Sequence, residues 1–147
     1  MLAGATDQKV LGYLGRALSL ELSAVQLYTT QARLTSVWGL DKAAERLRQE
    51  AREENEHAER IIARMIAHGV APGASQLRAV KLGPDLVSLL RFNRKFELEL
   101  VNLYQDAVTH CLRQGNKDER VFFQTLLDEE KQHAADLSKW IESVEST

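Results

Sequence analysis

The sequence EAREENEHAERI at residues 50–61 has a counterpart, LLDEEKQHAADL, at residues 126–137. Each contains Glu-x-x-His-Ala, beginning at Glu54 in the first copy and at Glu130, 76 positions later, in the second. Residues three apart on an α-helix share a face, so each glutamate and its histidine point the same way. Apolar residues recur every three or four positions around both copies, which predicts that they lie on amphipathic helices.

A second pair of acidic residues repeats in the same register. Glu21 stands where the apolar spacing of residues 14–32 requires a core residue, and Glu97 follows 76 positions later. Tyr28 and Tyr104 come one heptad after these glutamates and are again 76 positions apart. A lone Glu-x-x-His arises by chance in many charged helices. Two copies, each with an acid in the apolar series 33 positions earlier, indicate a site.

Sparse glycine and proline punctuation predicts four long helices. We expect them at about Asp7–Val37, Asp41–His68, Pro84–Gly115, and from Asn116 or Asp118 to about Val144. Asp7 and Asp41 are suitable N-caps, and Gly69 suits the position that stops a helix. Pro84 suits the first turn of the third helix.

The links between these helices predict the topology. Two links are short, so the first and second helices are antiparallel, as are the third and fourth. Gly69–Gly83 has 15 residues and can reach about 50 Å. A helix of 28 residues is only about 42 Å long, so this link can make the second and third helices parallel. We therefore expect one all-α domain over residues 1–147, a ferritin-like four-helix bundle with one long crossover.

Composition excludes several classes of protein. The chain has 147 residues, 44% of them hydrophobic, which is enough for a core without disulfides. A net charge of −2, from 19 basic and 21 acidic residues, argues against nucleic acid or an anionic membrane surface as partner. Cys111 is the only cysteine, as suits a reducing compartment. No apolar run approaches a membrane span. Residues 1–7 lack an export signal, so we expect a cytoplasmic protein.

Four carboxylates in one core require compensation. Each would cost several kcal/mol if it stayed ionised without a counter-charge. Two divalent cations would balance the four charges, and two neutral imidazoles would complete a ligand set that suits Fe, Mn or Zn. The candidate ligands are Glu21, Glu54, His57, Glu97, Glu130 and His133. Tyr28 and Tyr104 are either hydrogen-bond donors beside these ligands or packing residues.

With these motifs the sequence resembles the bacterioferritin family over nearly its whole length. The matching features are Glu21 with Tyr28, Trp38-Gly39-Leu40, Glu54-x-x-His57, Lys81-Leu82-Gly83, Glu97 and Glu130-x-x-His133. The resemblance implies a ferroxidase, which oxidises Fe(II) with oxygen or peroxide and stores ferric mineral in a shell of 24 subunits.

The resemblance also implies a role for each candidate ligand. Glu54 and Glu130 would bridge two irons. The other four ligands would each take one metal: Glu21, His57, Glu97 and His133. Tyr28 would assist from beside them. The chain would form a homo-oligomer of twofold dimers, with Leu34, Val37 and Trp38 at the dimer contact.

Three departures from the family pattern alter these expectations. The family's haem-ligating methionine directly follows the bridging glutamate of the second helix, where this chain has Asn55, so we expect no haem. Gln49 and Glu53 replace a histidine and an aspartate that hold iron on the family's inner surface. The sequence ends at Thr147 with no residues for the family's fifth helix, which makes a complete cage less expected.

Two other functions remain open from the sequence. The first is a di-metal oxidase or oxygenase that acts on an organic substrate, which requires a substrate pocket at the metals. The second is a structural or iron-delivery subunit without enzymatic activity in a mixed shell.

Overall fold

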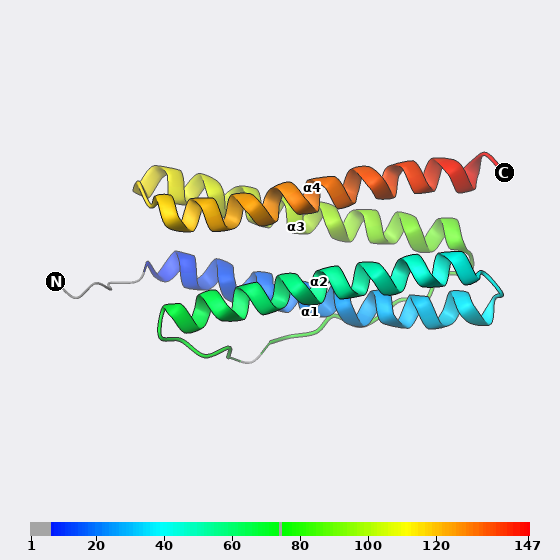
Figure 1. Cartoon of the computed structure of the whole chain (residues 1–147), viewed down its shortest axis with the longest axis horizontal. Helices are drawn as coiled ribbons and strands as arrows, with labels where there is room; N and C mark the ends of the chain where they lie inside the picture. Colours follow the sequence, from blue (N-terminus) through cyan, green and yellow to red (C-terminus); the bar gives the residue numbers. More distant parts are fainter. Residues whose placement is uncertain (1–6, 74) are drawn as a thin grey trace. The chain divides into compact units, whose positions relative to one another are not determined.

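The computed structural model describes residues 7–73 and 75–147, and its regular structure is entirely helical (Figure 1). The helices are α1 (Gln8–Val37), α2 (Asp41–Ala67), α3 (Leu86–Gln114) and α4 (Lys117–Glu145). They match the four helices expected from the sequence. The expectation about an export signal rests mainly on residues 1–6, which lie outside the described residues.

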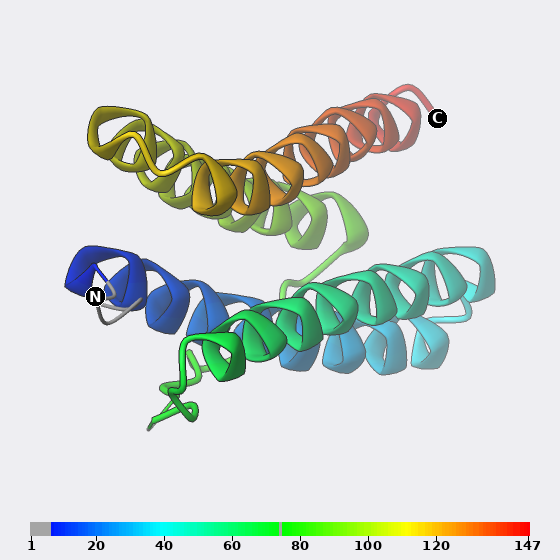
Figure 2. The same ribbon diagram turned by 60° about the vertical axis from the view of Figure 1, so that its left-hand side comes forward.

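The chain divides into two compact units, the first ending at Lys81 and the second beginning at Leu82. In the first unit α1 packs against α2, and in the second α3 packs against α4 (Figures 1 and 2). Each unit is therefore a hairpin of two antiparallel helices, as the short links predict. The assignment of the whole chain to a single domain stays a prediction.

Helix ends confirm some expected caps and correct others. The side chain of Asp7 caps α1 by accepting from the Lys9 amide at 2.8 Å, and Asn116 caps α4. The expectation that Asp41 is an N-cap is wrong, because the Leu40 carbonyl already accepts the first helical bond, from Ala44. Asp41 instead occupies the first turn of α2, where its negative charge faces the positive end of the helix dipole.

The start of α3 also differs from the expectation. Pro84 lies before the helix, and Asp85 is its N-cap. A carboxylate oxygen of Asp85 accepts from the Ser88 amide at 2.9 Å, which satisfies one of the amides that helix geometry leaves unpaired. Gly69 and Gly115 follow α2 and α3 with φ of +74° and +65°, a conformation that favours glycine.

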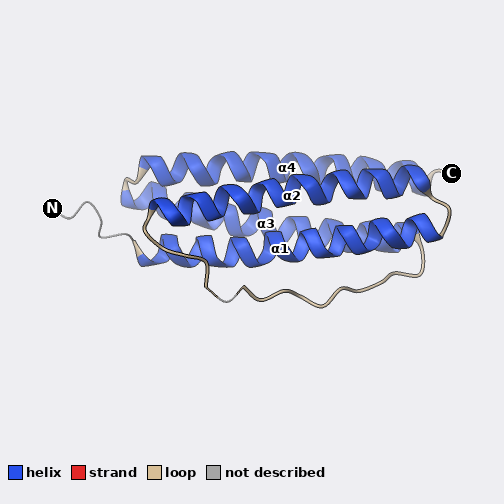
Figure 3. Ribbon diagram, turned by 60° about the horizontal axis from the view of Figure 1, so that its bottom comes forward, coloured by secondary structure: helices blue, strands red, loops and turns tan. Residues whose placement is uncertain are grey.

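The link after α2 lies along α1 (Figure 3). The hydroxyl of Ser19 accepts from the amide of Gln76 at 3.2 Å, and the hydroxyl of Ser23 accepts from the amide of Arg78 at 3.0 Å. Ser23 in turn donates to the carbonyl of Ser19 at 2.7 Å, so one helix turn holds two points of the link. Among the described residues, no helix has the length and hydropathy needed to cross a bilayer.

Candidate metal centre

The first unit contains a buried cluster of two carboxylates and one imidazole. Glu21 comes from α1, whereas Glu54 and His57 come from adjacent turns of α2. Nδ1 of His57 lies within hydrogen-bond distance of Oε2 of Glu21, at 3.0 Å, and the same nitrogen lies 3.6 Å from Oε1 of Glu54. One ligand atom from each residue lies within 4.8 Å of the others. All three residues are at most 1% exposed.

The second unit repeats this cluster. Glu97 comes from α3, and Glu130 and His133 come from α4. His133 Nδ1 lies 3.6 Å from Oε2 of Glu130, and one ligand atom of each residue again lies within 4.8 Å of the others. Both glutamates are buried, whereas the His133 side chain is 20% exposed.

Apolar neighbours along each helix keep water away from the carboxylates. In the first unit Leu18 precedes Glu21, and Leu47 and Ile61 lie on either side of the α2 motif, all at most 2% exposed. In the second unit Leu90 precedes Glu97 and Leu126 precedes Glu130, and both leucines are at most 1% exposed. The 3-4 apolar spacing therefore forms the core, and the ligands lie within it.

The chemistry of each cluster fits a divalent cation. Two carboxylates carry a charge of −2, which one divalent ion balances, and a neutral imidazole adds a nitrogen ligand. Both side-chain oxygens of Glu54 and of Glu130 are buried, and each residue has a 3.6 Å contact with its own histidine. A carboxylate oxygen and an imidazole nitrogen this close together suit a shared metal ion.

The structure brings the six predicted ligands together as two groups of three, one in each unit. That the two groups form one dinuclear centre stays a prediction.

Tyr28 and Tyr104 are 1% and 0% exposed, respectively. The ring of Tyr104 packs against Phe123, with centroids 6.4 Å apart and planes tilted by 35°. This contact supports the packing interpretation for Tyr104. The role of Tyr28 beside the ligands stays a prediction.

Other buried polar residues were not anticipated as part of the core: Gln31, Thr35, Asn93 and Glu119. The first two were predictable, because they continue the 3-4 spacing beyond Tyr28. Glu119 lies three residues after the N-cap Asn116, whose side chain accepts from the Glu119 amide at 3.2 Å. An N-cap residue followed three positions later by glutamate is a known helix-start pattern, and it could have identified this position.

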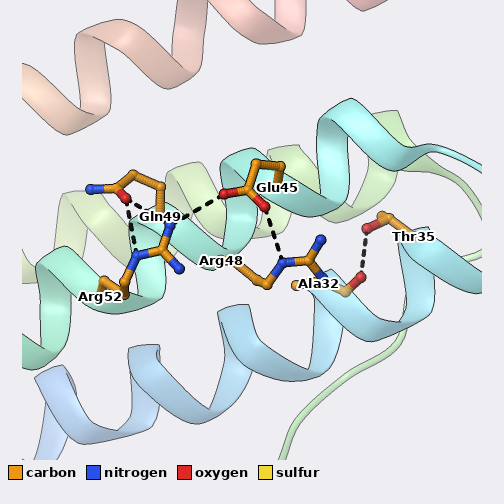
Figure 4. Close-up of polar contacts among 6 residues, drawn as sticks. All are labelled: Ala32, Thr35, Glu45, Arg48, Gln49 and Arg52. Carbon is orange, nitrogen blue, oxygen red and sulfur yellow. Dashed lines mark hydrogen bonds and ion pairs between the residues drawn. The ribbon is translucent and has the colours of Figure 1, made fainter.

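A polar network covers the exposed side of α2 (Figure 4). The guanidinium of Arg52 donates to Oε1 of Gln49 at 2.8 Å and to Glu45 at 3.3 Å, and Arg48 also donates to Glu45 at 3.3 Å. Hydrogen bonds from Arg48 and then Arg52 lower the pKa of Glu45 below its ordinary value. The side-chain amide nitrogen of Gln49 also donates to Oε1 of Glu53 at 3.4 Å. The amide of Gln49 therefore links Arg52 to Glu53.

A groove of about 350 Å³ lies beside this network on the first unit. Its lining residues are Val25, Thr29, Arg48, Ala51, Arg52 and Asn55. The groove includes none of the six cluster residues. It therefore offers no support for an organic substrate held at the metals.

Comparisons with known proteins identify the family of this chain. The sequence profile of the ferritin family, described as a ferritin-like domain, matches residues 11–147. A bacterioferritin of Rhodobacter capsulatus is 32% identical over 127 residues, which cover 86% of this chain and 79% of that protein. A bacterial ferritin of Neisseria meningitidis serogroup A is 31% identical over 140 residues, covering 95% of this chain and 90% of the relative.

A solved structure of the Rhodobacter capsulatus bacterioferritin, described as having a metal-free dinuclear site and a haem iron, matches with a TM-score of 0.90. The two chains are 31% identical, and the match covers 95% of this chain and 88% of the other. The fold class is thus the all-α, ferritin-like four-helix bundle. The chain belongs to the ferritin family and is bacterioferritin-like.

Proposed function

We propose that this protein is a ferroxidase that oxidises Fe(II) to Fe(III) for iron storage or detoxification. One observation carries the proposal: a buried cluster of two glutamates and one histidine occurs once in each unit, at positions 76 residues apart. Membership of the ferritin family supports iron as the metal, and the Rhodobacter capsulatus relative is described as having a dinuclear site.

The proposal gives each ligand a role. Glu54 and Glu130 would be the bridging carboxylates that the family resemblance implies. The remaining ligands each bind one iron: Glu21, His57, Glu97 and His133. Two Fe(II) ions balance the four carboxylates in charge, which permits these groups to stay ionised in a core that excludes water.

The reaction requires iron, an oxidant and protons. Two Fe(II) ions lose two electrons in total. These electrons reduce one O₂ to H₂O₂ with the uptake of two protons, or one H₂O₂ to two waters with the uptake of two protons. The residues of this chain hold the ions together and exclude bulk water. Nδ1 of His57 lies 3.0 Å from Oε2 of Glu21, and whichever imidazole nitrogen binds an iron ion must carry no proton.

An anaerobic titration with Fe(II), followed by addition of oxygen, tests the proposal. We expect two Fe(II) ions per chain and a rise in ferric absorbance after oxygen. Glu54→Ala and Glu130→Ala should abolish both tight binding and rapid oxidation. Glu56→Ala, which removes an exposed carboxylate from the same turn of α2, is the matched control and should leave both unchanged.

The possible outcomes separate the alternatives. Full oxidation by Glu54→Ala would show that the site is assigned wrongly. Metal binding without oxidation would favour a structural or delivery subunit. Rapid oxygen consumption only in the presence of an added organic substrate would favour an oxygenase.

We also propose where the protein acts, how it assembles and whether it holds haem. The protein acts in the cytoplasm, as a homo-oligomer of twofold dimers or as a larger or mixed shell, and it holds no haem.

A further inference from the structure

The two clusters have the same ligands but different surroundings. The His57 side chain is 2% exposed, whereas the His133 side chain is 20% exposed. His57 is held by a hydrogen bond to Glu21, a residue of the neighbouring helix, at 3.0 Å. Water therefore reaches the histidine of the second unit much more readily than that of the first.

The charges beside the two histidines also differ. Residues four before and three after a helical position lie on its face. At His133 these residues are Glu129 and Asp136, both half-buried and both acidic. At His57 they are Glu53 and Arg60, so a cation replaces one of the two acids.

Contacts within each helix hold these flanking residues in place. A carboxylate oxygen of Asp136 accepts from the side-chain amide of Gln132 at 2.9 Å. A guanidinium nitrogen of Arg60 lies 3.6 Å from Glu56, and the Arg60 side chain is 32% exposed. Between residue 60 and its counterpart 136 in the 76-residue repeat, the charge therefore reverses.

We propose that metal ions enter and leave the protein mainly at the His133 cluster, and that the ion at the His57 cluster exchanges more slowly. This inference rests on the proposed function, because it requires that both clusters bind metal. Water can replace a ligand more readily at a partly exposed histidine. Two carboxylates beside that histidine also attract an arriving cation, whereas Arg60 repels one. Asp136 and Arg60 are thus positioning residues that set the rate of metal exchange.

Release of Co(II) tests this inference without any measurement of iron oxidation. The metal-free protein is loaded with Co(II) alone, mixed with excess chelator, and followed by its visible absorption. We expect two phases of equal amplitude. Their rate constants should differ by about tenfold or more, the ratio that a barrier difference of about 1.4 kcal/mol produces.

Two substitutions, each of which removes one charge, test the two clusters separately and leave all six candidate ligands intact. Asp136→Asn should slow Co(II) uptake at the fast-exchanging site, because it removes an attracting charge, whereas Arg60→Gln should accelerate uptake at the slow one. Added salt should reduce the effect of both substitutions on uptake, since it screens exposed charges. Circular dichroism of each variant establishes that the helices are retained.

Each outcome bears on one proposal. Release in a single phase, an uptake rate insensitive to Asp136→Asn, or a fast phase of release that survives in His133→Gln while the slow phase disappears would overturn the inference. Equal release of two bound ions leaves the proposed function standing. Failure to bind two Co(II) ions per chain counts against the proposed function itself.

Discussion

Glu54 and Glu130 place carboxyl groups where water does not reach, so their substitution should separate metal binding from folding. A metal that binds only the folded chain raises its stability, by about 2.7 kcal/mol at one hundred times Kd. Glu54→Gln and Glu130→Gln should lose this gain. Glutamine keeps the size and removes the charge, so the metal-free Tm should stay the same or rise.

Thermal unfolding with and without Mn(II), followed by circular dichroism, measures both effects. Glu56→Gln serves as the control, because that side chain is exposed on the same helix. It should keep the full response to metal. An undiminished increase in Tm for Glu54→Gln would contradict the assignment of this residue as a ligand.

Asn55 leads to a second prediction, on haem. It directly follows Glu54, is exposed on α2, and lines the groove with Val25 and Ala51. An amide cannot supply the thioether ligand that the family's haem iron requires, so we expect the purified protein to show no Soret absorption. Absorption spectra of protein produced with added haem precursor test this expectation. A Soret band of near-stoichiometric intensity would refute it.

The N-cap of α3 predicts how helix stability depends on pH. Hydrogen bonds from Ser88, first from its backbone amide, lower the pKa of Asp85 below its ordinary value. A carboxylate with a lowered pKa stabilises the fold above the pKa of aspartate in the unfolded chain. This contribution disappears as the pH falls through the lower pKa of the folded state.

Asp85→Ala should therefore lower Tm at neutral pH, and the difference from wild type should shrink at acidic pH. Asp85→Asn retains a capping oxygen and should lose less stability. Its own capping contribution should not depend on pH in this range. Thermal unfolding from neutral pH to below the ordinary pKa of aspartate measures these differences. A constant difference in Tm between wild type and Asp85→Ala across that range would exclude a charged cap.

Helix ends show where sequence patterns suffice and where they do not. Asp7, Asn116 and the stop at Gly69 were predictable, because each is a short side chain or glycine at a break in apolar spacing. The N-cap of α2 was not, because Leu40 occupies it without a side-chain hydrogen bond. The sequence predicted Pro84 in the first turn of α3, and only the structure shows that Asp85 caps this helix.

The link along α1 yields a prediction that sequence patterns could not supply. The hydroxyl of Ser23 accepts from the Arg78 amide, and that of Ser19 accepts from the Gln76 amide. Ser23→Ala should increase hydrogen exchange at Arg78, because this amide loses its acceptor in α1. Ser19→Ala is the matched variant, with its main effect at Gln76. Unchanged exchange at both amides in both variants would show that these bonds do not hold the link.

The two clusters of the candidate site were predictable because the sequence repeats their residues at a fixed distance. A single motif would have had an ordinary interpretation as a buried polar pair. Difference within the repeat was harder to foresee. The greater exposure of His133 depends on packing, and the contrast of Arg60 with Asp136 gains meaning only once the burial of both clusters is known. The sequence repeat therefore identifies the candidate ligands, whereas the packing of the side chains determines how far solvent reaches them.

The molecule as a whole should assemble through apolar residues near the end of α1. Val37 is 79% exposed, and Leu34 and Trp38 lie beside it, half-buried. Exposed apolar groups of this size favour a protein contact. We expect at least a twofold dimer, so light scattering should give about 33 kDa for the dimer or about 400 kDa for a 24-subunit shell, from 16.6 kDa per chain.

Val37→Glu should shift the assembly toward the monomer, because a charge in an apolar contact loses its hydration without gaining a partner. Leu77→Glu is the control: Leu77 is 52% exposed but lies in the link, away from the end of α1. Light scattering at several protein concentrations distinguishes weakened assembly from misfolding, since a weakened dimer recovers its mass as concentration rises. A wild-type protein that is monomeric throughout would contradict the predicted dimer. If only Leu77→Glu lowers the mass, the contact lies elsewhere.

A dimer that oxidises iron without retaining it would indicate detoxification, whereas a shell that retains the oxidised metal would indicate storage.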